Sequence, residues 1–266
     1  MPRITDRDEI RSLLETDRGW SVYALGDLSP GFFEQSEWYR PAGGGPALIL
    51  IFRAFSIPVL FALGEAALLS DVLDEIGPEP EIYLSVRPEI LPLIKARRTV
   101  LGETPMWRML LDPAEYRPAP CEEAVRLGRD DFPALRQLYA DGEPSGETPG
   151  FFDASMLEPG VFCGVYEDHS LVAAAGTHLV APSEGAAAIG NVYTRRDRRG
   201  QGLAARVTTA VTTELLRMGL PTVALNVSQH NAPALRVYER LGFRRYCSFY
   251  EGIATQGRTT SGEPPS

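Results

Sequence analysis

The sequence has very little lysine and cysteine, and each shortage excludes a class of site. Lys95 is the only lysine among 26 basic residues. A GxxxxGK[ST] phosphate loop needs a glycine directly before its lysine, whereas Ile94 precedes Lys95, so P-loop NTPase chemistry is excluded. The cysteines Cys121, Cys163 and Cys247 form no CxxC pair, so neither a zinc ribbon nor a disulfide framework is expected.

Histidine and positive charge are scarce as well. The three histidines, His169, His178 and His230, show no metal-ligand spacing, so we expect no bound catalytic metal. Acidic residues outnumber basic ones by 35 to 26, which argues against a nucleic-acid binder. No run of about 18 uncharged apolar residues occurs, and the first ten residues lack a signal-peptide core. We therefore expect a cytoplasmic protein that binds neither nucleic acid nor membranes.

The composition that is present suits a folded chain of one large or two small domains. Hydrophobic residues make up 44% of the 266 residues, enough for a substantial core. A proline-rich stretch at 112–120 predicts a boundary between domains at 1–117 and 121–254. The polar residues 255–266 predict a disordered tail.

Apolar periodicity and turn residues predict an α/β chain with a mixed α+β sheet. An aromatic-rich loop is expected at 20–39. The expected helices cover 7–15, 65–76, 88–96, 130–141, 203–218 and 231–241. The expected strands cover 47–53, 58–63, 82–86, 106–111, 161–166, 171–180, 186–194, 222–227 and 243–250. Both halves run hairpin, longer helix, strand, shorter helix, strand, which predicts a weak internal repeat.

The halves differ in the link between hairpin and longer helix. In the first half this link is Gly64 alone, whereas in the second it carries four arginines and two glycines between a strand and a helix. Glycines let backbone N–H groups approach a ligand, and arginines and a helix N-terminus attract anions. The segment therefore predicts a pyrophosphate site.

Two alternatives remain for this link. It could be a glycine turn on a solvated basic loop. Gly200-x-Gly202-x-x-Ala205 also fits the dinucleotide fingerprint of a Rossmann unit. The Rossmann interpretation lacks its acidic residue, because the next strand ends in Val227-Ser228 and then glutamine, and too little chain follows for a doubly wound sheet.

The motif Arg199-Gly200-Gln201-Gly202-Leu203-Ala204 resembles the phosphate loop of the GNAT superfamily of acyl-CoA-dependent N-acyltransferases. A second GNAT motif is matched, in the family's order, by Asn231, Ala234, Tyr238 and Gly242-Phe243. The resemblance covers about residues 121–250. It implies two tandem GNAT-like domains, each a mostly antiparallel sheet flanked by helices, the first degenerate. The pairing is similar to the glycine N-acyltransferase-like branch.

The resemblance also implies roles for matched positions. Tyr238 would protonate the leaving thiolate. The residues expected to hold acetyl-CoA, or another short acyl-CoA, are Val192, Tyr193, Thr194, Arg199, Gly200, Gln201, Gly202, Leu203, Ala204 and Asn231. A tyrosine with a pKa near 10 stays protonated at neutral pH, and a donor beside a thiolate of pKa about 8.5 eases its departure. For Tyr238 the alternative is a core tyrosine, and for Asn231 it is a helix cap.

The proton acceptor for the amine is left open by the sequence. Residues 186–194 contain no carboxylate, where some GNAT members carry a glutamate. Asn191 could orient a water, and Glu184 and His178 are other candidates. The acidic loop with Asp141 and Glu147 could attract a cationic amine or could simply be exposed.

Together the residues and the resemblance predict an N-acyltransferase, with N-acetyl transfer as the expected reaction. It would move the acyl group from acyl-CoA to a small-molecule or peptide amine by direct attack in a ternary complex. No cysteine is placed for a covalent acyl-enzyme. The alternative is a non-catalytic module that binds CoA or acyl-CoA as a sensor or scaffold.

Overall fold

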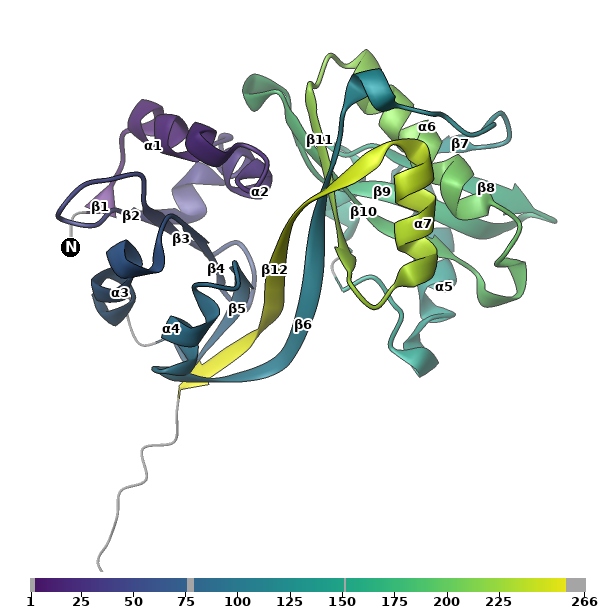
Figure 1. Cartoon of the computed structure of the whole chain (residues 1–266). Helices are drawn as coiled ribbons and strands as arrows, with labels where there is room; N and C mark the ends of the chain where they lie inside the picture. The colour runs from purple at the N-terminus through teal and green to yellow at the C-terminus, as the bar shows by residue number, and fades with distance from the viewer. Residues whose placement is uncertain (1–2, 76–78, 151, 257–266) are drawn as a thin grey trace, which may run out of the picture. The chain divides into compact units, whose positions relative to one another are not determined.

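The computed structural model describes residues 3–75, 79–150 and 152–256, and the chain folds into two compact units (Figure 1). Each unit gathers separate stretches of chain, which are 1–17, 30–106 and 248–266 for unit 1, and 18–29 and 107–247 for unit 2. The chain therefore passes between the units at 17/18, 29/30, 106/107 and 247/248, and the hinge expected at 112–120 lies inside unit 2.

Unit 1 is built on a mixed sheet in which antiparallel pairs predominate. Its strands follow the order β1-β2-β3-β4-β5 and then β12, and only the β4–β5 pair is parallel. Their bounds are β1 Arg3–Ile4, β2 Ser36–Tyr39, β3 Leu48–Phe52, β4 Val59–Leu63 and β5 Glu81–Val86. The hairpin predicted at 47–63 is confirmed as β3–β4.

Three helices accompany this sheet: α1 (Arg7–Leu14), α3 (Ala66–Glu75) and α4 (Leu91–Lys95). Asp6 caps α1 by accepting hydrogen bonds from the backbone N–H groups of the next turn. The core of unit 1 joins α3 and α4 to the strands, with Leu69 and Ile94 buried against Ile49 and Leu84.

The sheet strands of unit 2 are also mixed in direction, and β10–β11 is the parallel pair. Its strands follow the order β11-β10-β9-β8-β7. Their bounds are β7 Val125–Leu127, β8 Phe162–Glu167, β9 Ser170–Ala181, β10 Ala186–Thr194 and β11 Thr222–Ser228. The tight β8–β9 turn places Asp168 and His169 at positive φ, as two-residue hairpins require.

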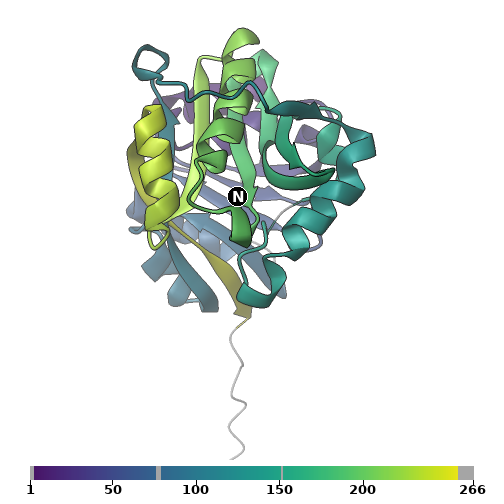
Figure 2. The ribbon, with the colours of Figure 1, turned by 90° about the vertical axis from the view of Figure 1, so that its right-hand side faces the viewer.

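Helices cover both faces of the strands of unit 2 (Figure 2). The helix α6 (Leu203–Arg217) buries Val207 and Val211 against Ile189 of β10, and α7 (Ala232–Leu241) joins the same cluster. On the other face, α5 (Phe132–Ala140) packs over Tyr193. The short α2 (Val22–Gly26) lies over β9 and β10 on that face.

Two long strands, β6 (Arg98–Leu111) and β12 (Phe243–Gln256), run through both units (Figure 1). The sequence predicts only their more apolar parts, 106–111 and 243–250. It also predicts a disordered tail from residue 255, whereas Thr255 pairs with Glu81 in β5. That part of the prediction is wrong, because strand pairing orders a polar segment that has no apolar periodicity. Residues 257–266 lie outside the described residues.

The predicted repeat is confirmed in the order of elements. The run β3-β4-α3-β5-α4-β6 in the first half matches β9-β10-α6-β11-α7-β12 in the second, with an antiparallel hairpin and one parallel pair in each. The loop predicted at 20–39 holds α2 and β2 instead. Within the described ranges, no helix is both long and apolar enough to cross a membrane.

Candidate functional site

Strand β10 is interrupted by a bulge at Asn191. It pairs with β9 at Gly190↔Gly176 and again at Tyr193↔Ala174, so β10 carries one extra residue between these pairs. Asn191 has φ +52°, an uncommon conformation for a residue other than glycine. Bulges bend a strand and re-aim its backbone groups. The bulge therefore turns the end of β10 away from a regular ladder.

Strands β10 and β11 are paired only at their beginnings. Their parallel register runs from Ala186↔Thr222 to Ile189↔Leu225, within the residues that the structure describes. Both strands continue beyond these pairs. The backbone of 192–194 therefore has β9 on one side, while its other edge is available to an extended ligand.

The turn after β10 leads two glycines into the start of α6. Gly200 and Gly202 have φ +80° and +81°. A Cβ on Gly200 would meet nothing within 4 Å, and a Cβ on Gly202 would meet only Arg206 Nε at 4.0 Å. Glycine is thus required here by backbone conformation and not by packing. The space in front of both residues is open.

The N-terminus of α6 is uncapped by any side chain. The first N–H groups of a helix have no acceptor within the helix, and the helix dipole places partial positive charge there. Open space, positive-φ glycines and an uncapped 15-residue helix together form a cradle that suits a phosphate.

The arginines of this turn are paired with carboxylates. Arg199 forms a two-pronged ion pair with Glu147, with nitrogen–oxygen distances of 3.2 and 3.0 Å. This hydrogen bonding by Arg199 lowers the pKa of Glu147. Arg198 binds Glu167 at 2.7 Å, and Arg195 binds Asp197 at 2.6 Å. The turn is therefore less positive than its sequence suggests.

The acidic loop after α5 holds this turn in place. Asp141 accepts hydrogen bonds from the Tyr193 hydroxyl and from the Arg196 backbone N–H, both at 2.9 Å. The Arg196 N–H is the main cause of the lowered pKa of Asp141. Tyr139, on α5, donates to the carbonyl of Asn191 at 2.9 Å. The geometry thus gives Asp141 and Glu147 partners in the turn, which the sequence alone does not reveal.

Comparison with known proteins agrees with this geometry. Residues 125–243 match the family described as "Acetyltransferase (GNAT) family". Residues 125–243 belong to the GNAT family. The match ends at the first residue of β12 and includes the bulge, the glycine turn and α7. Among curated proteins, none matches the chain.

Solved structures extend the GNAT likeness to the whole chain. A structure assigned to the GNAT acetyltransferases from Novosphingobium aromaticivorans has 24% identity and a TM-score of 0.61, covering 89% of this chain and 96% of its own. A GCN5-related N-acetyltransferase from Kribbella flavida has 17% identity and a TM-score of 0.64, covering 92% and 96%.

A tandem GNAT protein from the clavulanic acid biosynthesis pathway covers 97% of this chain and 98% of its own. Its identity is 14% and its TM-score is 0.57. At these identities the matches show the fold, and the fold is a tandem GNAT-like arrangement.

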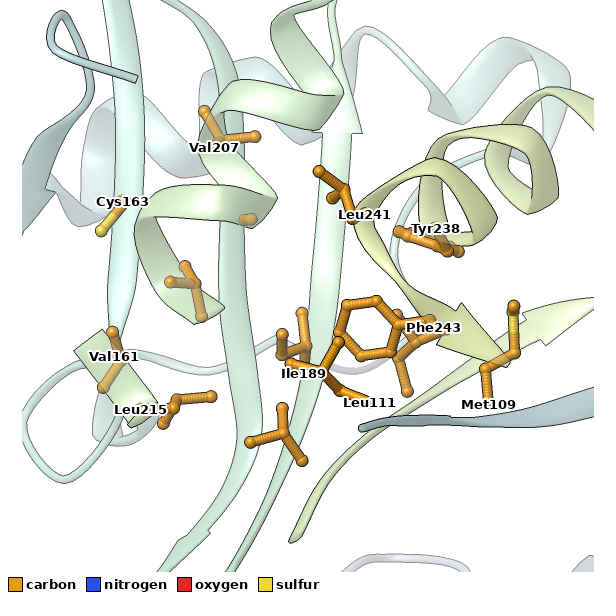
Figure 3. Close-up of a cluster of buried hydrophobic side chains, with 14 of the residues drawn as sticks. Met109, Leu111, Val161, Cys163, Ile189, Val207, Leu215, Tyr238, Leu241 and Phe243 are labelled. Atoms are coloured by element: carbon orange, nitrogen blue, oxygen red, sulfur yellow. The ribbon is translucent and has the colours of Figure 1, made fainter. Parts of the chain in front are cut away.

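In the GNAT domain, Tyr238 is part of the hydrophobic core. The residue is 7% exposed, and its ring meets Phe243 edge-on with centroids 6.2 Å apart. Figure 3 shows Tyr238 in one cluster with Leu241 and Phe243. Burial raises the pKa of Tyr238, so its phenol stays protonated at neutral pH. Tyr238 therefore packs as the alternative interpretation, a core tyrosine, predicts. Its role as an acid stays a prediction.

Asn231 caps α7, which confirms the helix cap that the sequence predicts as the alternative to coenzyme binding. Its side-chain oxygen accepts a hydrogen bond from the Ala234 N–H at 3.1 Å. Coenzyme binding by Asn231 stays a prediction. Cys163 is buried in the core, where burial raises its pKa to about 11, so its thiol is unsuited to carry an acyl group.

The candidates for the proton acceptor lie at different places on the GNAT sheet. Glu184 lies in the turn that precedes β10, before the first residue of the strand. His178 lies on β9, and its ring covers Gly190, directly before the bulge. Asn191 is buried at the bulge itself. The structure therefore brings His178 and Asn191 together and leaves Glu184 at the other end of the strand.

The sequence misses the contribution of residues 18–29 to the GNAT unit. Arg18 donates to the Thr222 hydroxyl at 2.7 Å, and Gly26 packs so closely on β9 that a Cβ would lie 2.1 Å from the Leu179 side chain. A five-residue helix without a side-chain cap gives little periodic signal.

Proposed function

We propose that the chain is an N-acyltransferase that moves an acyl group, most simply acetyl, from acyl-CoA to an amine. The observation that carries this proposal is the continuous run from the β10 bulge through the glycine turn into the uncapped start of α6. Within about a dozen residues, it offers a free strand edge followed by an anion cradle, which suits a long ligand ending in a pyrophosphate.

Each part of the run would take one part of the coenzyme. The pyrophosphate would accept hydrogen bonds from the backbone N–H groups of 199–204. The pantetheine arm would add to the free edge of β10 along 192–194. The open surroundings of Gly200 and Gly202 support this placement, because a Cβ on either residue would meet no protein atom closer than 4.0 Å. The acyl end of the arm would then reach Asn191.

The reaction would proceed by direct attack in a ternary complex. The amine nitrogen would attack the thioester carbonyl, the carbon–sulfur bond would break, and Tyr238 would give its proton to the departing thiolate. A buried phenol is protonated before each turnover, which supports Tyr238 as the donor. The acceptor is proposed to be a small-molecule or peptide amine.

The test is a panel of amines and amino acids assayed for acetyl-CoA-dependent release of CoA, with acetyl-CoA binding measured by calorimetry. We expect binding and turnover with at least one amine. The alternative, a CoA sensor or scaffold, is favoured by the lack of a carboxylate on β10. Binding without turnover across the panel would support that alternative and overturn the proposed transfer.

A further inference from the structure

His178 lies where the acyl end of the coenzyme would meet its acceptor. The residue sits in β9 between Thr177, which pairs with Ile189, and Leu179, which pairs with Ala188. A Cβ on Gly190 would lie 2.3 Å from both Nε2 and Cε1 of the His178 ring. The ring edge that carries Nε2 therefore lies on the backbone of β10, one residue before the bulge.

The other ring nitrogen of His178 has a protein partner. Its Nδ1 lies 3.2 Å from the hydroxyl oxygen of Tyr23, on α2. The Arg108 guanidinium stacks over the Tyr23 ring, 4.6 Å from its centroid, and also over Trp20. When Nδ1 carries the proton and donates it to Tyr23, Nε2 presents a lone pair. In that tautomer the His178 ring can accept a proton at the β10 side while it keeps its contact with Tyr23.

Asn191 provides a second, independent observation at the same place. The residue is 4% exposed, and within the described residues neither Oδ1 nor Nδ2 meets the full geometry of a hydrogen bond, although the amide lies close enough to the His178 ring to interact with it. An unpartnered buried amide is costly, so such a group generally has a ligand or water to bind. The surrounding atoms partly desolvate His178 and lower its pKa, while the nearby Asn191 amide favours the imidazolium.

His178 and Asn191 lie at the end of the path that the pantetheine arm is proposed to take. The cradle lies at 199–204, and the proposed arm runs back along β10 from Thr194 to Val192. Its reactive end therefore points to Asn191 and Gly190, where the Nε2 edge of His178 lies and the ring stays accessible to solvent. Gly190 has no side chain, so the His178 ring can lie against its backbone. Strand β10 itself carries no carboxylate that could act as the base.

We propose that His178 is the general base of the transfer, with Tyr23 as the residue that positions it and the Asn191 amide as a hydrogen-bond partner for the acceptor or its water. Nε2 takes the proton that the amine loses as its nitrogen bonds to the acyl carbon. The imidazolium then returns this proton to water. Tyr238 protonates the thiolate and regains a proton from water before the next turnover. This inference rests on the proposed acyltransferase function.

The test compares three variants with the wild-type chain, using the amine that the panel shows to react fastest. His178→Ala is expected to lower kcat/KM for the amine by about 10²- to 10⁴-fold, with partial rescue by added imidazole. The affinity for acetyl-CoA is expected to stay unchanged. His169→Ala, on the β8–β9 turn, and Asp27→Asn are expected to stay within about threefold of wild type.

Asp27 is included because it is the competing base at the end of α2. Burial raises the pKa of Asp27 to about 8, so its carboxyl could also titrate near neutral pH. A large loss in Asp27→Asn with near-wild-type activity in His178→Ala would overturn the inference. His178→Gln, which keeps a polar side chain of similar size, replaces the alanine variant if that variant fails to fold, with the same expected loss.

The outcomes separate the two proposals. Wild-type protein that turns over no amine overturns the proposed function and this inference with it. Active wild-type protein together with active His178→Ala and His178→Gln overturns only the role of His178. If His178→Ala and His178→Gln each lose acetyl-CoA affinity by as much as they lose kcat/KM, His178 is assigned to coenzyme binding. That result would likewise overturn its role as a base.

Discussion

The two hairpin-to-helix links of this chain show how one fold can keep or lose a ligand site. In unit 2, β10 is bulged and is followed by an eight-residue turn, 195–202, before α6. In unit 1, the β3–β4 register is regular from Leu48↔Leu63 to Phe52↔Val59, and only two residues precede α3. The first link has no room for successive backbone donors around a phosphate.

The glycines of the two links serve different purposes. Gly64 has φ +111°, and a Cβ there would lie 2.7 Å from the Cβ of Ala47. Gly202 has φ +81° and faces open space. The first glycine is therefore needed for close packing on its own sheet, whereas the second keeps space free outside the protein. A glycine after a strand is thus no sign of a ligand until its surroundings are known.

The largest expected effect follows from this contrast. Gly64→Ala should lower the free energy of unfolding by about 2–4 kcal/mol, because it combines a steric overlap with a left-handed backbone. It should leave the affinity for acetyl-CoA unchanged. Urea denaturation and calorimetry on the same preparation measure both. A loss of coenzyme affinity in the folded variant would contradict the separation of the two links.

The second helices of the two repeats differ in the same way. The helix α4 buries Leu91 and Ile94 and contains no tyrosine, whereas α7 carries Tyr238. Tyr238→Phe keeps the ring and removes the hydroxyl, so kcat should fall by roughly 10²-fold or more with little change in acetyl-CoA affinity. Tyr166→Phe, at an exposed position of β8, is the control. Unchanged kcat under chemistry-limited conditions would return Tyr238 to a packing role.

The phosphate cradle itself gives a smaller but direct effect. Gly202→Asp should weaken acetyl-CoA binding at least tenfold, about 1.4 kcal/mol, because it places a side chain and a negative charge in the cradle. Gly102→Asp is a matched control in unit 1, since Gly102 also has a positive φ and a Cβ there would meet nothing within 4 Å. Equal affinities for the two variants by calorimetry would count against the cradle.

The smallest expected effect concerns the ion pair that covers the turn. Glu147→Gln should raise acetyl-CoA affinity by roughly two- to fivefold, because an exposed pair worth about 0.2–1 kcal/mol no longer competes for Arg199. Glu143→Gln, in the same loop, should leave it unchanged. A weaker affinity in Glu147→Gln would show that this pair helps to build the site.

Much of the fold could be predicted from local pattern. The helix α6 repeats apolar residues at core spacing and is followed by Gly219 and Pro221, and α7 lies between Asn231 and Gly242. The phosphate turn is equally predictable, because strand, glycines and helix are consecutive. These features depend on neighbours in sequence, where propensity and capping act.

The rest depends on partners distant in sequence. The assignment of 18–29 to unit 2 comes from contacts with β9 and β10, more than 150 residues away along the chain. The pairing of Thr255 with Glu81 is likewise non-local. The proximity of His178 to Gly190 depends on strand register and on two irregularities in β9–β10. No local pattern encodes these relations.

The most direct test of a single coenzyme site is the stoichiometry of acetyl-CoA binding to the whole chain, measured by isothermal titration calorimetry. We predict one coenzyme per chain, bound at the turn of unit 2, because only that repeat, within the described residues, combines the bulge, the glycine turn and the uncapped helix. A stoichiometry near two would place a second site in unit 1 and contradict this prediction, and so would the absence of binding.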